Sequence, residues 1–262
     1  YWPDGLVKQI ATNNVVDGGS IAATNTYDYN KRRLLTGESL TQDGSPAWSL
    51  GYGYDALGHL NSHSYPSGRS VAYAPNALGQ PAQAGTFATN VRYHPSGAMA
   101  QFTYGNGQIH TLTQNARGLP ERSRDSSSNA TALDDSYDYD AHGNVAAISD
   151  GRTGNRGHRD MAYDGLDRLT ATTSPMFGAA TYAYDVLDNL KQIKVNGRDH
   201  TYIYDASNRL TNVMAGSSTV MGLGYDVQGN LNNKSGQTFT FDHGNRLRAA
   251  AGETYRYDGH GR

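Results

Sequence analysis

The stretch Tyr54-Asp55-Ala56-Leu57-Gly58-His59-Leu60 decides the fold. It recurs as Tyr139-Asp140-Ala141-His142-Gly143-Asn144-Val145 and again as Tyr225-Asp226-Val227-Gln228-Gly229-Asn230-Leu231. Self-similarity at a period of about 20–50 residues is the signature of a repeat architecture. Aligning each copy on its tyrosine gives thirteen units, with anchors at positions 1, 29, 54, 75, 93, 114, 139, 163, 184, 204, 225, 241 and 257. We therefore interpret residues 1–262 as one repeat array, truncated at both ends, with no separate second domain.

The anchor of each unit is expected on a strand that enters a turn. It is Tyr or Phe in eleven of the thirteen units, and Pro75 and Gln114 are the exceptions. A large apolar or aromatic residue stands two positions earlier, as in Tyr202-Ile203-Tyr204. Side chains two apart on a strand share one face. The pattern predicts that Tyr-x-Tyr forms the inward face of the entering strand.

The residues after the anchor predict a tight turn. Asp or Asn follows the anchor in eleven units, and its side chain can accept hydrogen bonds from backbone amides two residues on. Gly, Asn or Asp stands four residues after the anchor, and these residues tolerate a left-handed backbone. Arg33 is the one departure, so we expect its turn to differ. Each unit therefore predicts strand, turn, strand.

Further turns must separate successive units. The stretches 65–69 and 104–107 are strong hairpin signals, whereas Asp150–Gly157 and Arg124–Asp135 are typical of longer surface loops. No window keeps a helical period for three turns. The predicted class is all-β, with tandem antiparallel hairpins in one wide sheet. About 26 strands at roughly 4.8 Å spacing would make a ribbon about 125 Å wide, which should curl into a spiral or barrel-like shell.

Composition excludes several classes of function. The chain has 22 Lys+Arg and 24 Asp+Glu, a net charge of −2, so nothing in it favours nucleic acid or an anionic membrane. With no cysteine, it has no disulfide, zinc–thiolate site or thiol nucleophile. No apolar run approaches the roughly 18 residues of a membrane span. The sequence opens and stops inside repeats and shows no signal-peptide pattern, as expected for a piece of a longer protein.

These units closely resemble the YD repeats of RHS proteins, which occur in bacterial polymorphic toxins, in insecticidal toxin complexes and in teneurins. The resemblance covers essentially the whole chain and implies a sheet that spirals into a hollow shell. In bacterial members it implies a shell that encloses a C-terminal toxin polypeptide, with secretion-system or toxin-complex components as partners. It also implies a secreted or cell-surface location. The absence of cysteine favours the bacterial branch.

One expected feature of that family is missing from this stretch. The shells of bacterial members close with Asp-Pro-x-Gly motifs whose aspartates perform self-cleavage, and no proline here follows an aspartate. Neither the self-cleaving core nor the toxin domain is therefore expected in this stretch. No catalytic, cofactor-binding or metal-binding residue is assigned, and the chain is interpreted as a structural segment and not an enzyme.

Other motifs have plain explanations. His59 and His63 have a helical metal spacing, but on a strand they would lie about 13 Å apart. Asp138 opens a calcium-like loop that lacks the required ligands at positions five and twelve, His142 and Ser149. The glycines in 51–53 and 222–224 precede no helix that could hold phosphate. Two glycosylation patterns begin at Asn129 and Asn233, and no Gly-x-Ser-x-Gly elbow is present.

Two alternatives remain open. The nineteen tyrosines could stack on sugars, which would make the chain a carbohydrate- or protein-binding module at a cell surface. Unpaired strands at the two ends of the ribbon would also be templates for edge-to-edge self-association.

Overall fold

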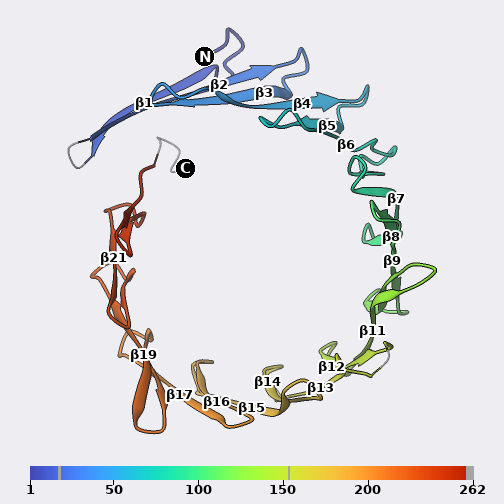
Figure 1. The fold of residues 1–262 in the computed structure, drawn as a ribbon, viewed down its shortest axis with the longest axis vertical. Helices are drawn as coiled ribbons and strands as arrows, with labels where there is room; N and C mark the ends of the chain where they lie inside the picture. Colours follow the sequence, from blue (N-terminus) through green and yellow to red (C-terminus); the bar gives the residue numbers. More distant parts are fainter. Residues whose placement is uncertain (17–18, 153, 258–262) are drawn as a thin grey trace. The chain divides into compact units, whose positions relative to one another are not determined.

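The protein is all-β in a computed structural model that describes residues 1–16, 19–152 and 154–257, with no helix among them. This result confirms the predicted class. The chain divides into two compact units, which are treated separately below (Figure 1). Unit 1 consists of Tyr1–Leu112 with Asp125–Ala130 and Tyr257, and unit 2 consists of Thr113–Arg124 with Thr131–Arg256. None of the described residues forms a helix that is long and apolar enough to cross a membrane.

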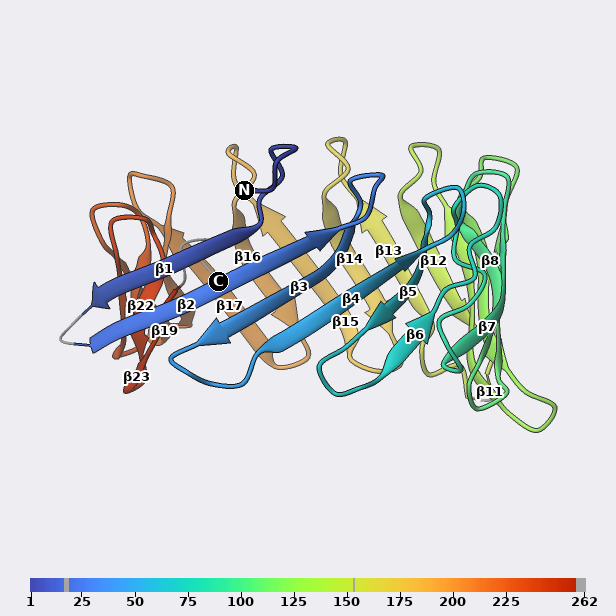
Figure 2. The same cartoon turned by 90° about the horizontal axis from the view of Figure 1, so that it is seen from above.

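Unit 1 contains a six-stranded antiparallel sheet followed by a smaller three-stranded set. The strands are β1 (Gln9–Val16), β2 (Gly19–Tyr29), β3 (Leu35–Gln42), β4 (Trp48–Tyr54), β5 (Leu60–Ser64), β6 (Ser70–Ala72), β7 (Ala88–Tyr93), β8 (Met99–Tyr104) and β9 (Ile109–Gln114), the last of which runs into unit 2. Figure 2 shows β1 to β6 side by side, in sequence order. Strand β1 pairs with β2 and forms the edge of this sheet.

Unit 2 continues the same hairpin pattern. Its strands are β10 (Pro120–Ser126), β11 (Thr131–Tyr139), β12 (Val145–Asp150), β13 (Arg159–Tyr163), β14 (Leu169–Ser174), β15 (Gly178–Tyr184), β16 (Leu190–Val195), β17 (Arg198–Tyr204), β18 (Leu210–Ala215), β19 (Ser218–Tyr225), β20 (Leu231–Lys234), β21 (Gln237–Phe241), β22 (Leu247–Ala250) and β23 (Glu253–Thr254). From β11 to β23, each strand pairs antiparallel with the next one in sequence. Antiparallel neighbours need only a short turn between them, which is what the repeat encodes.

A β-bulge recurs at the anchor of the repeat. Asp138 faces Ala147, but the next residue, Tyr139, faces Val145, so Ala146 is left without a partner. The same shift occurs before Tyr163, Tyr184, Tyr204 and Tyr225. A bulge bends its strand and increases the local twist. Each of these repeats therefore adds a similar local distortion to the sheet.

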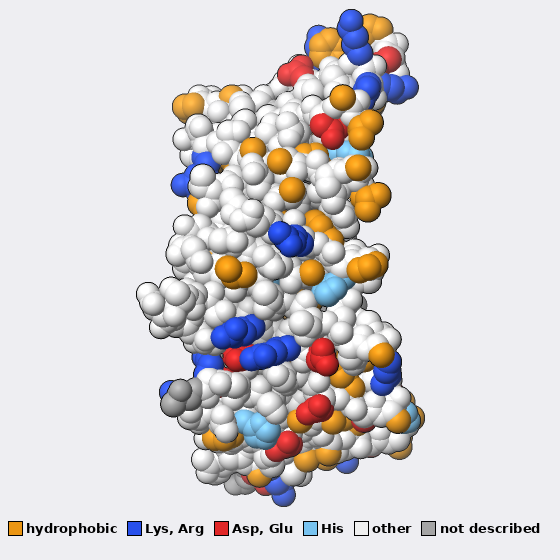
Figure 3. All heavy atoms as spheres, turned by 90° about the vertical axis from the view of Figure 1, so that its right-hand side faces the viewer, with side chains coloured by type: hydrophobic (Ala, Val, Ile, Leu, Met, Phe, Trp, Pro, Cys, Tyr) orange, Lys and Arg blue, Asp and Glu red, His pale blue; other side chains and the backbone are white. Residues whose placement is uncertain are grey.

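Burial is shallow in both units. No whole residue among the described residues is less than 2% exposed, and the buried apolar residues are Ala23, Val71, Ala180, Val213 and Ala250. Within each unit, Figures 1 and 2 show a single layer of strands with no second layer packed on it. Figure 3 shows hydrophobic side chains scattered over an otherwise polar surface. Stability must therefore rely heavily on hydrogen-bonded ladders and on contacts between neighbours in one face of the sheet.

The Tyr-x-Tyr pairs share the less exposed face of their strands. In β15, Tyr182 and Tyr184 are half-buried, whereas Ala183 between them is exposed. Tyr182 lies opposite Ile193, and Tyr202 lies opposite the buried Val213. This arrangement confirms the predicted sharing of one face, which we call the tyrosine face.

The turns follow the predicted backbone, with one correction. All described residues at the fourth position after the anchor have positive φ, from 59° at Asn245 to 99° at Gly143. Gly261 lies outside the described residues. The expectation that Arg33 would make a different turn is wrong, because Arg33 has a φ of 66° and its amide bonds to the Asn30 carbonyl as in the other units. The Asn30 side chain fixes this turn by accepting the amides of Arg32 and Leu34.

Two further expectations need correction, and two hairpins are confirmed. Arg124–Asp135 is not a long loop, because β10 and β11 extend into it and leave only residues 127–130 outside strands. The unit anchored at Pro75 forms its turn but no returning strand before β7. Pro75 and Pro81 lack the amide that a ladder needs. The turns at 65–69 and 104–107 form as predicted, with Gly68 and Gly107 at positive φ.

Candidate functional site

The aspartate after each anchor holds its turn together. Asp164 Oδ1 accepts the amides of Leu166 at 2.9 Å and of Arg168 at 3.0 Å. The sequence predicted the bond from the amide two residues later, at Leu166, but not the bond from the amide of Arg168. A comparable pattern, with one side-chain oxygen accepting two backbone amides, occurs at Asn30, Asp55, Asn76, Asn115, Asp140, Asp185, Asp205, Asp226 and Asp242.

The second carboxylate oxygen is used as well. Arg168 donates its Nε to Asp164 Oδ2 at 2.8 Å and its Nη1 to Asp188 Oδ1 of the next turn at 2.7 Å. The side-chain hydrogen bond from Arg168 and the backbone amides lower the pKa of Asp164, against a smaller opposing effect of burial. In unit 2, successive turns project from one edge of the sheet (Figure 2) and are joined by bonds of this kind. These carboxylates are therefore committed to structure.

The anchor tyrosines use their hydroxyl groups to bridge adjacent repeats. Tyr163 donates to the Val145 carbonyl at 3.0 Å, and Tyr204 donates to the Leu190 carbonyl at 3.1 Å. Each acceptor stands six residues after the preceding anchor, where that repeat leaves its bulge. The same bond is made by Tyr54, Tyr93, Tyr139, Tyr184 and Tyr225. Phenylalanine could fill the same space but not make this bond, which explains the preference for tyrosine at the anchor.

An arginine–carboxylate cluster occupies the start of unit 2. Asp134, Asp135 and Asp150 are all less than 10% exposed. Arg122 binds Asp134 through two bonds of 2.6 and 2.8 Å, and Arg152 binds Asp150 through two bonds of 2.9 and 2.8 Å. Asp135 lies opposite Asp150 across β11 and β12, and burial raises the pKa of Asp135. Asp134 and Asp150 are neutralised by these bidentate pairs, whereas ionised Asp135 is disfavoured.

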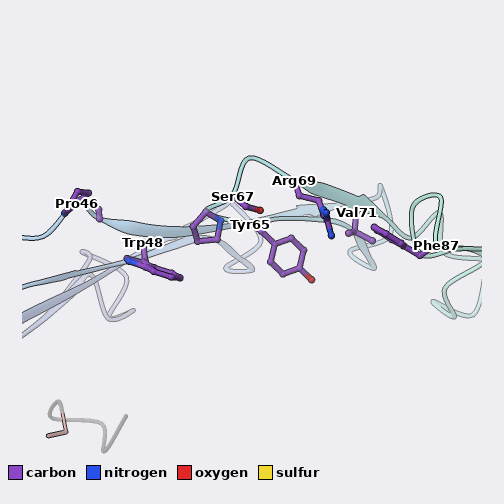
Figure 4. A pocket seen from close by; sticks show the side chains of 9 residues that line it. Pro46, Trp48, Tyr65, Ser67, Arg69, Val71 and Phe87 are labelled. Atoms are coloured by element: carbon purple, nitrogen blue, oxygen red, sulfur yellow. The ribbon is translucent and has the colours of Figure 1, made fainter. Parts of the chain in front are cut away.

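An aromatic groove lies in unit 1. It consists of two adjoining hollows of about 910 and 340 Å³ that share Trp48, Tyr65 and Pro66. Trp48 is 70% exposed and Phe87 is 53% exposed. Trp48, Tyr65 and the Arg69 guanidinium project from the same side of the chain in Figure 4. Large exposed rings in a hollow mark a surface suited to binding.

The structure separates the two histidines that have metal-like spacing. His59 Nδ1 lies 3.1 Å from Asp55 Oδ2 in a turn, whereas the His63 ring stacks between Tyr52 and Tyr65. Across the described residues, no group of three or more His, Cys, Asp or Glu side chains could hold a metal ion. The calcium-like stretch from Asp138 is instead a repeat turn, in which Asp140 accepts the amides of Gly143 and Asn144.

The glycines flanking Tyr52 are strand glycines. A Cβ on Gly53 would meet the Ser62 hydroxyl on the neighbouring strand, so this glycine lets the Ser62 side chain lie close to the strand. Gly224 similarly faces Asn232 and Asn233. Both residues lie in strands, and no helix follows either of them among the described residues.

The comparisons with known proteins agree with the repeat chemistry. A family model described as Teneurin YD-shell matches residues 178–262. Most of the present chain has the same fold as part of the solved TcdB2-TccC3 chains. The match to the TcdB2-TccC3-Cdc42 crystal structure covers 92% of this chain, with a TM-score of 0.70 and 16% identity.

Residues 178–262 match the Teneurin YD-shell family, and most of the chain has the fold of the TcdB2-TccC3 structures.

Two further solved structures share this fold. TcdB2-TccC3 without its hypervariable C-terminal region matches 92% of this chain at a TM-score of 0.68 and 16% identity. The Tc holotoxin pore of Photorhabdus luminescens matches 92% at a TM-score of 0.63 and 15% identity. The present chain spans about 15% of the length of each of these solved chains. No curated protein sequence matches it.

Three features of this protein were not predicted from the sequence. The hydroxyl-to-carbonyl bond could have been inferred from the preference for tyrosine over phenylalanine at the anchor. The cluster around Asp134 has a weaker signal in the charged residues of 121–125 and 134–135. The groove at Trp48 has no local sequence signal, because its lining comes from five separate segments, at 25, 38–40, 46–50, 65–71 and 87.

Proposed function

We propose that this YD-repeat chain is a segment of a curled β-sheet wall that encloses a C-terminal toxin polypeptide. One observation carries the proposal: a one-layer antiparallel sheet in which each repeat bonds to the next through turn and tyrosine contacts. Such a sheet can be lengthened by adding repeats without the need for a larger core. The repeats of both units would form one continuous array, and the accumulated bulges would provide the curl.

The partners and location belong to the same proposal. The remaining shell of a parent protein and its enclosed toxin would be the direct partners, with toxin-complex or secretion-system components acting in delivery. The matched structures bear the names of toxin-complex components, which supports this reading. The parent would act outside the producing cell or at its surface. The role is structural, and the chain would contribute no catalytic residue.

Limited proteolysis of the parent protein tests the wall. The segment that follows the repeats should resist a broad-specificity protease in the intact parent and should be cut rapidly when expressed alone. Mass spectrometry of the products gives the rate of each cut. Equal rates in the two forms would overturn the proposal.

A second candidate function is a binding module at a cell surface, for carbohydrate or for protein. The observation that favours it is the aromatic groove, where Trp48 and Tyr65 expose flat rings beside the guanidinium of Arg69. Aromatic faces of this kind can pack against sugars or against apolar peptide side chains. A glycan array, probed with the chain and with a Trp48→Ala variant, tests the carbohydrate form. Selective binding that the variant loses is expected if this candidate is correct, and no binding would remove it.

A further inference from the structure

The groove in unit 1 follows the tyrosine face across several strands. Leu40 on β3 lies opposite Trp48 on β4, and both line the smaller hollow. His63 on β5 lies opposite Val71 on β6, and Val71 lines the larger hollow. The groove therefore crosses the strands from β3 to β6 instead of running along one of them. Three strand spacings of roughly 4.8 Å give it a length of about 14 Å.

The lining of the groove is mainly apolar. Seven of the nine residues around the larger hollow have apolar or aromatic side chains, and only two are polar, Ser67 and Arg69. A sugar needs many directional hydrogen bonds to replace those it makes with water. Extended peptides instead dock in aromatic-lined grooves through apolar side chains and a few polar contacts. The composition therefore favours a peptide over a glycan.

Each hollow contains one charged side chain, and the two charges are opposite. The Arg69 guanidinium lies 5.3 Å from the centre of the Phe87 ring, and no carboxylate among the described residues forms an ion pair with it. Glu38 lines the smaller hollow, where its Oε1 accepts the Tyr52 hydroxyl at 2.8 Å. A ligand that spans the groove would meet a cation at one end and a carboxylate at the other.

We propose that this groove binds an extended polypeptide segment with an acidic residue at the Arg69 end, a basic residue at the Glu38 end and apolar residues between them. An extended chain covers about 3.3 Å per residue, so about four or five residues would span the groove. The apolar residues would pack on Trp48 and Tyr65, with the acidic residue on Arg69. The inference deepens the proposed binding and enclosing functions by naming the chemistry of the segment held, and it rests on the groove alone.

An array of synthetic octamers with a basic end, an apolar middle and an acidic end tests the proposal on the complete 262-residue chain. A matched array carries the same apolar residues without the charges. The charged octamers should bind, and Trp48→Ala should weaken the best of them about tenfold or more. Arg69→Glu should shift the preference toward octamers that are basic at both ends. Leu57→Ala is the matched control, because Leu57 is 69% exposed in unit 1 but does not line the groove.

Circular dichroism and the thermal midpoint show whether each variant keeps its fold. If Trp48→Ala loses its fold, Arg69→Glu alone decides the outcome, because Arg69 is an exposed side chain. The proposal is overturned if no octamer binds, if Arg69→Glu leaves the charge preference unchanged, or if the chain binds glycans at Trp48 and no peptide. These binding measurements do not depend on whether the chain encloses a toxin. Equal cleavage rates in the protease experiment would therefore count against enclosure and not against binding at the groove.

Discussion

The Tyr225 hydroxyl donates to the backbone carbonyl of Leu210 at 2.7 Å and thereby bonds one repeat to the preceding one. The side chain of Arg209 also packs on the Tyr225 ring, with its guanidinium carbon 5.0 Å from the ring centre. Tyr225→Phe keeps the ring and removes only the hydroxyl. We expect the free energy of unfolding to fall by about 1 kcal/mol, because the Leu210 carbonyl loses its donor. Chemical denaturation with an unchanged slope would measure this loss.

Phe241 offers the reverse substitution. It occupies an anchor position without a hydroxyl, and the equivalent acceptor is the carbonyl of Leu231, six residues after the preceding anchor Tyr225. Phe241→Tyr should stabilise the protein by restoring the missing bond to the preceding repeat. If Tyr225→Phe were neutral, the hydroxyl bonds would not contribute to the cohesion of the repeats.

Arg33 adopts a left-handed backbone that glycine adopts at lower cost. Its φ is 66°, and a non-glycine residue in this region is destabilised by about 1 kcal/mol. Arg33→Gly should therefore raise the free energy of unfolding by up to about that amount, since its pairing with Asp4 is exposed and weak. A urea titration would measure the gain.

The neighbouring arginine provides the control. Arg32→Gly removes the same charge from the same turn, but Arg32 does not have positive φ, so this change should be neutral or destabilising. Gly58→Ala should destabilise, because Gly58 has a φ of 94° at the equivalent position. A gain in both arginine variants would point to charge and not to backbone strain.

Asp135 should make stability depend on pH. Burial raises the pKa of its carboxyl group above the value in the unfolded chain, so the ionised form is disfavoured in the folded state. The associated penalty is absent below the unfolded pKa of about 4 and grows as pH rises through it. Asp135→Asn should therefore raise the thermal midpoint at neutral pH and have less effect in acid. Thermal melts between pH 3 and 8 would measure the difference.

Asp134 is adjacent in sequence, and its contribution to stability should depend on pH in the opposite sense to that of Asp135. The side-chain hydrogen bond from Arg122 lowers the pKa of Asp134. The ionised Asp134 carboxylate therefore stabilises the folded state above the unfolded pKa, and this stabilisation is lost as pH falls through the lower folded pKa. Asp134→Asn should cost about 1 kcal/mol at neutral pH. Equal shifts in the two variants would show that burial at Asp135 is not the cause.

The edge strand β1 should promote self-association. The stretch Gln9–Val16 contains no charge and no proline, the residues that usually protect an exposed edge. We expect the mass from light scattering to rise with protein concentration. The double variant Ala11→Lys and Asn13→Lys should reduce this rise, because both side chains are exposed on β1. Ala183→Lys, on a strand that pairs on both sides, should not. A concentration-independent monomer would contradict the prediction.

Much of the fold could be predicted because each repeat column has a local cause. The short acceptor of Asp164 and the left-handed backbone of Asp167 act within five residues, so neither depends on distant structure. The turn at Arg33 forms like the others despite its arginine, because the acceptor at Asn30 is sufficient to form it. The groove could not be predicted, because it depends on contacts between distant residues. The cross-strand register brings Leu40 opposite Trp48, and the segment 73–86 places Phe87 in the lining.

A sheet that is one layer thick gives the chain two surfaces that share a backbone but not side chains. Tyr182 and Ala183 are neighbours in sequence, yet they belong to opposite surfaces. Substitutions at positions such as Ala183 can alter one surface while the tyrosine contacts on the other are unchanged. The two surfaces can therefore diverge independently during evolution. Such a protein can adapt the side chains of one surface to a new partner or solvent while those of the other surface stay unchanged.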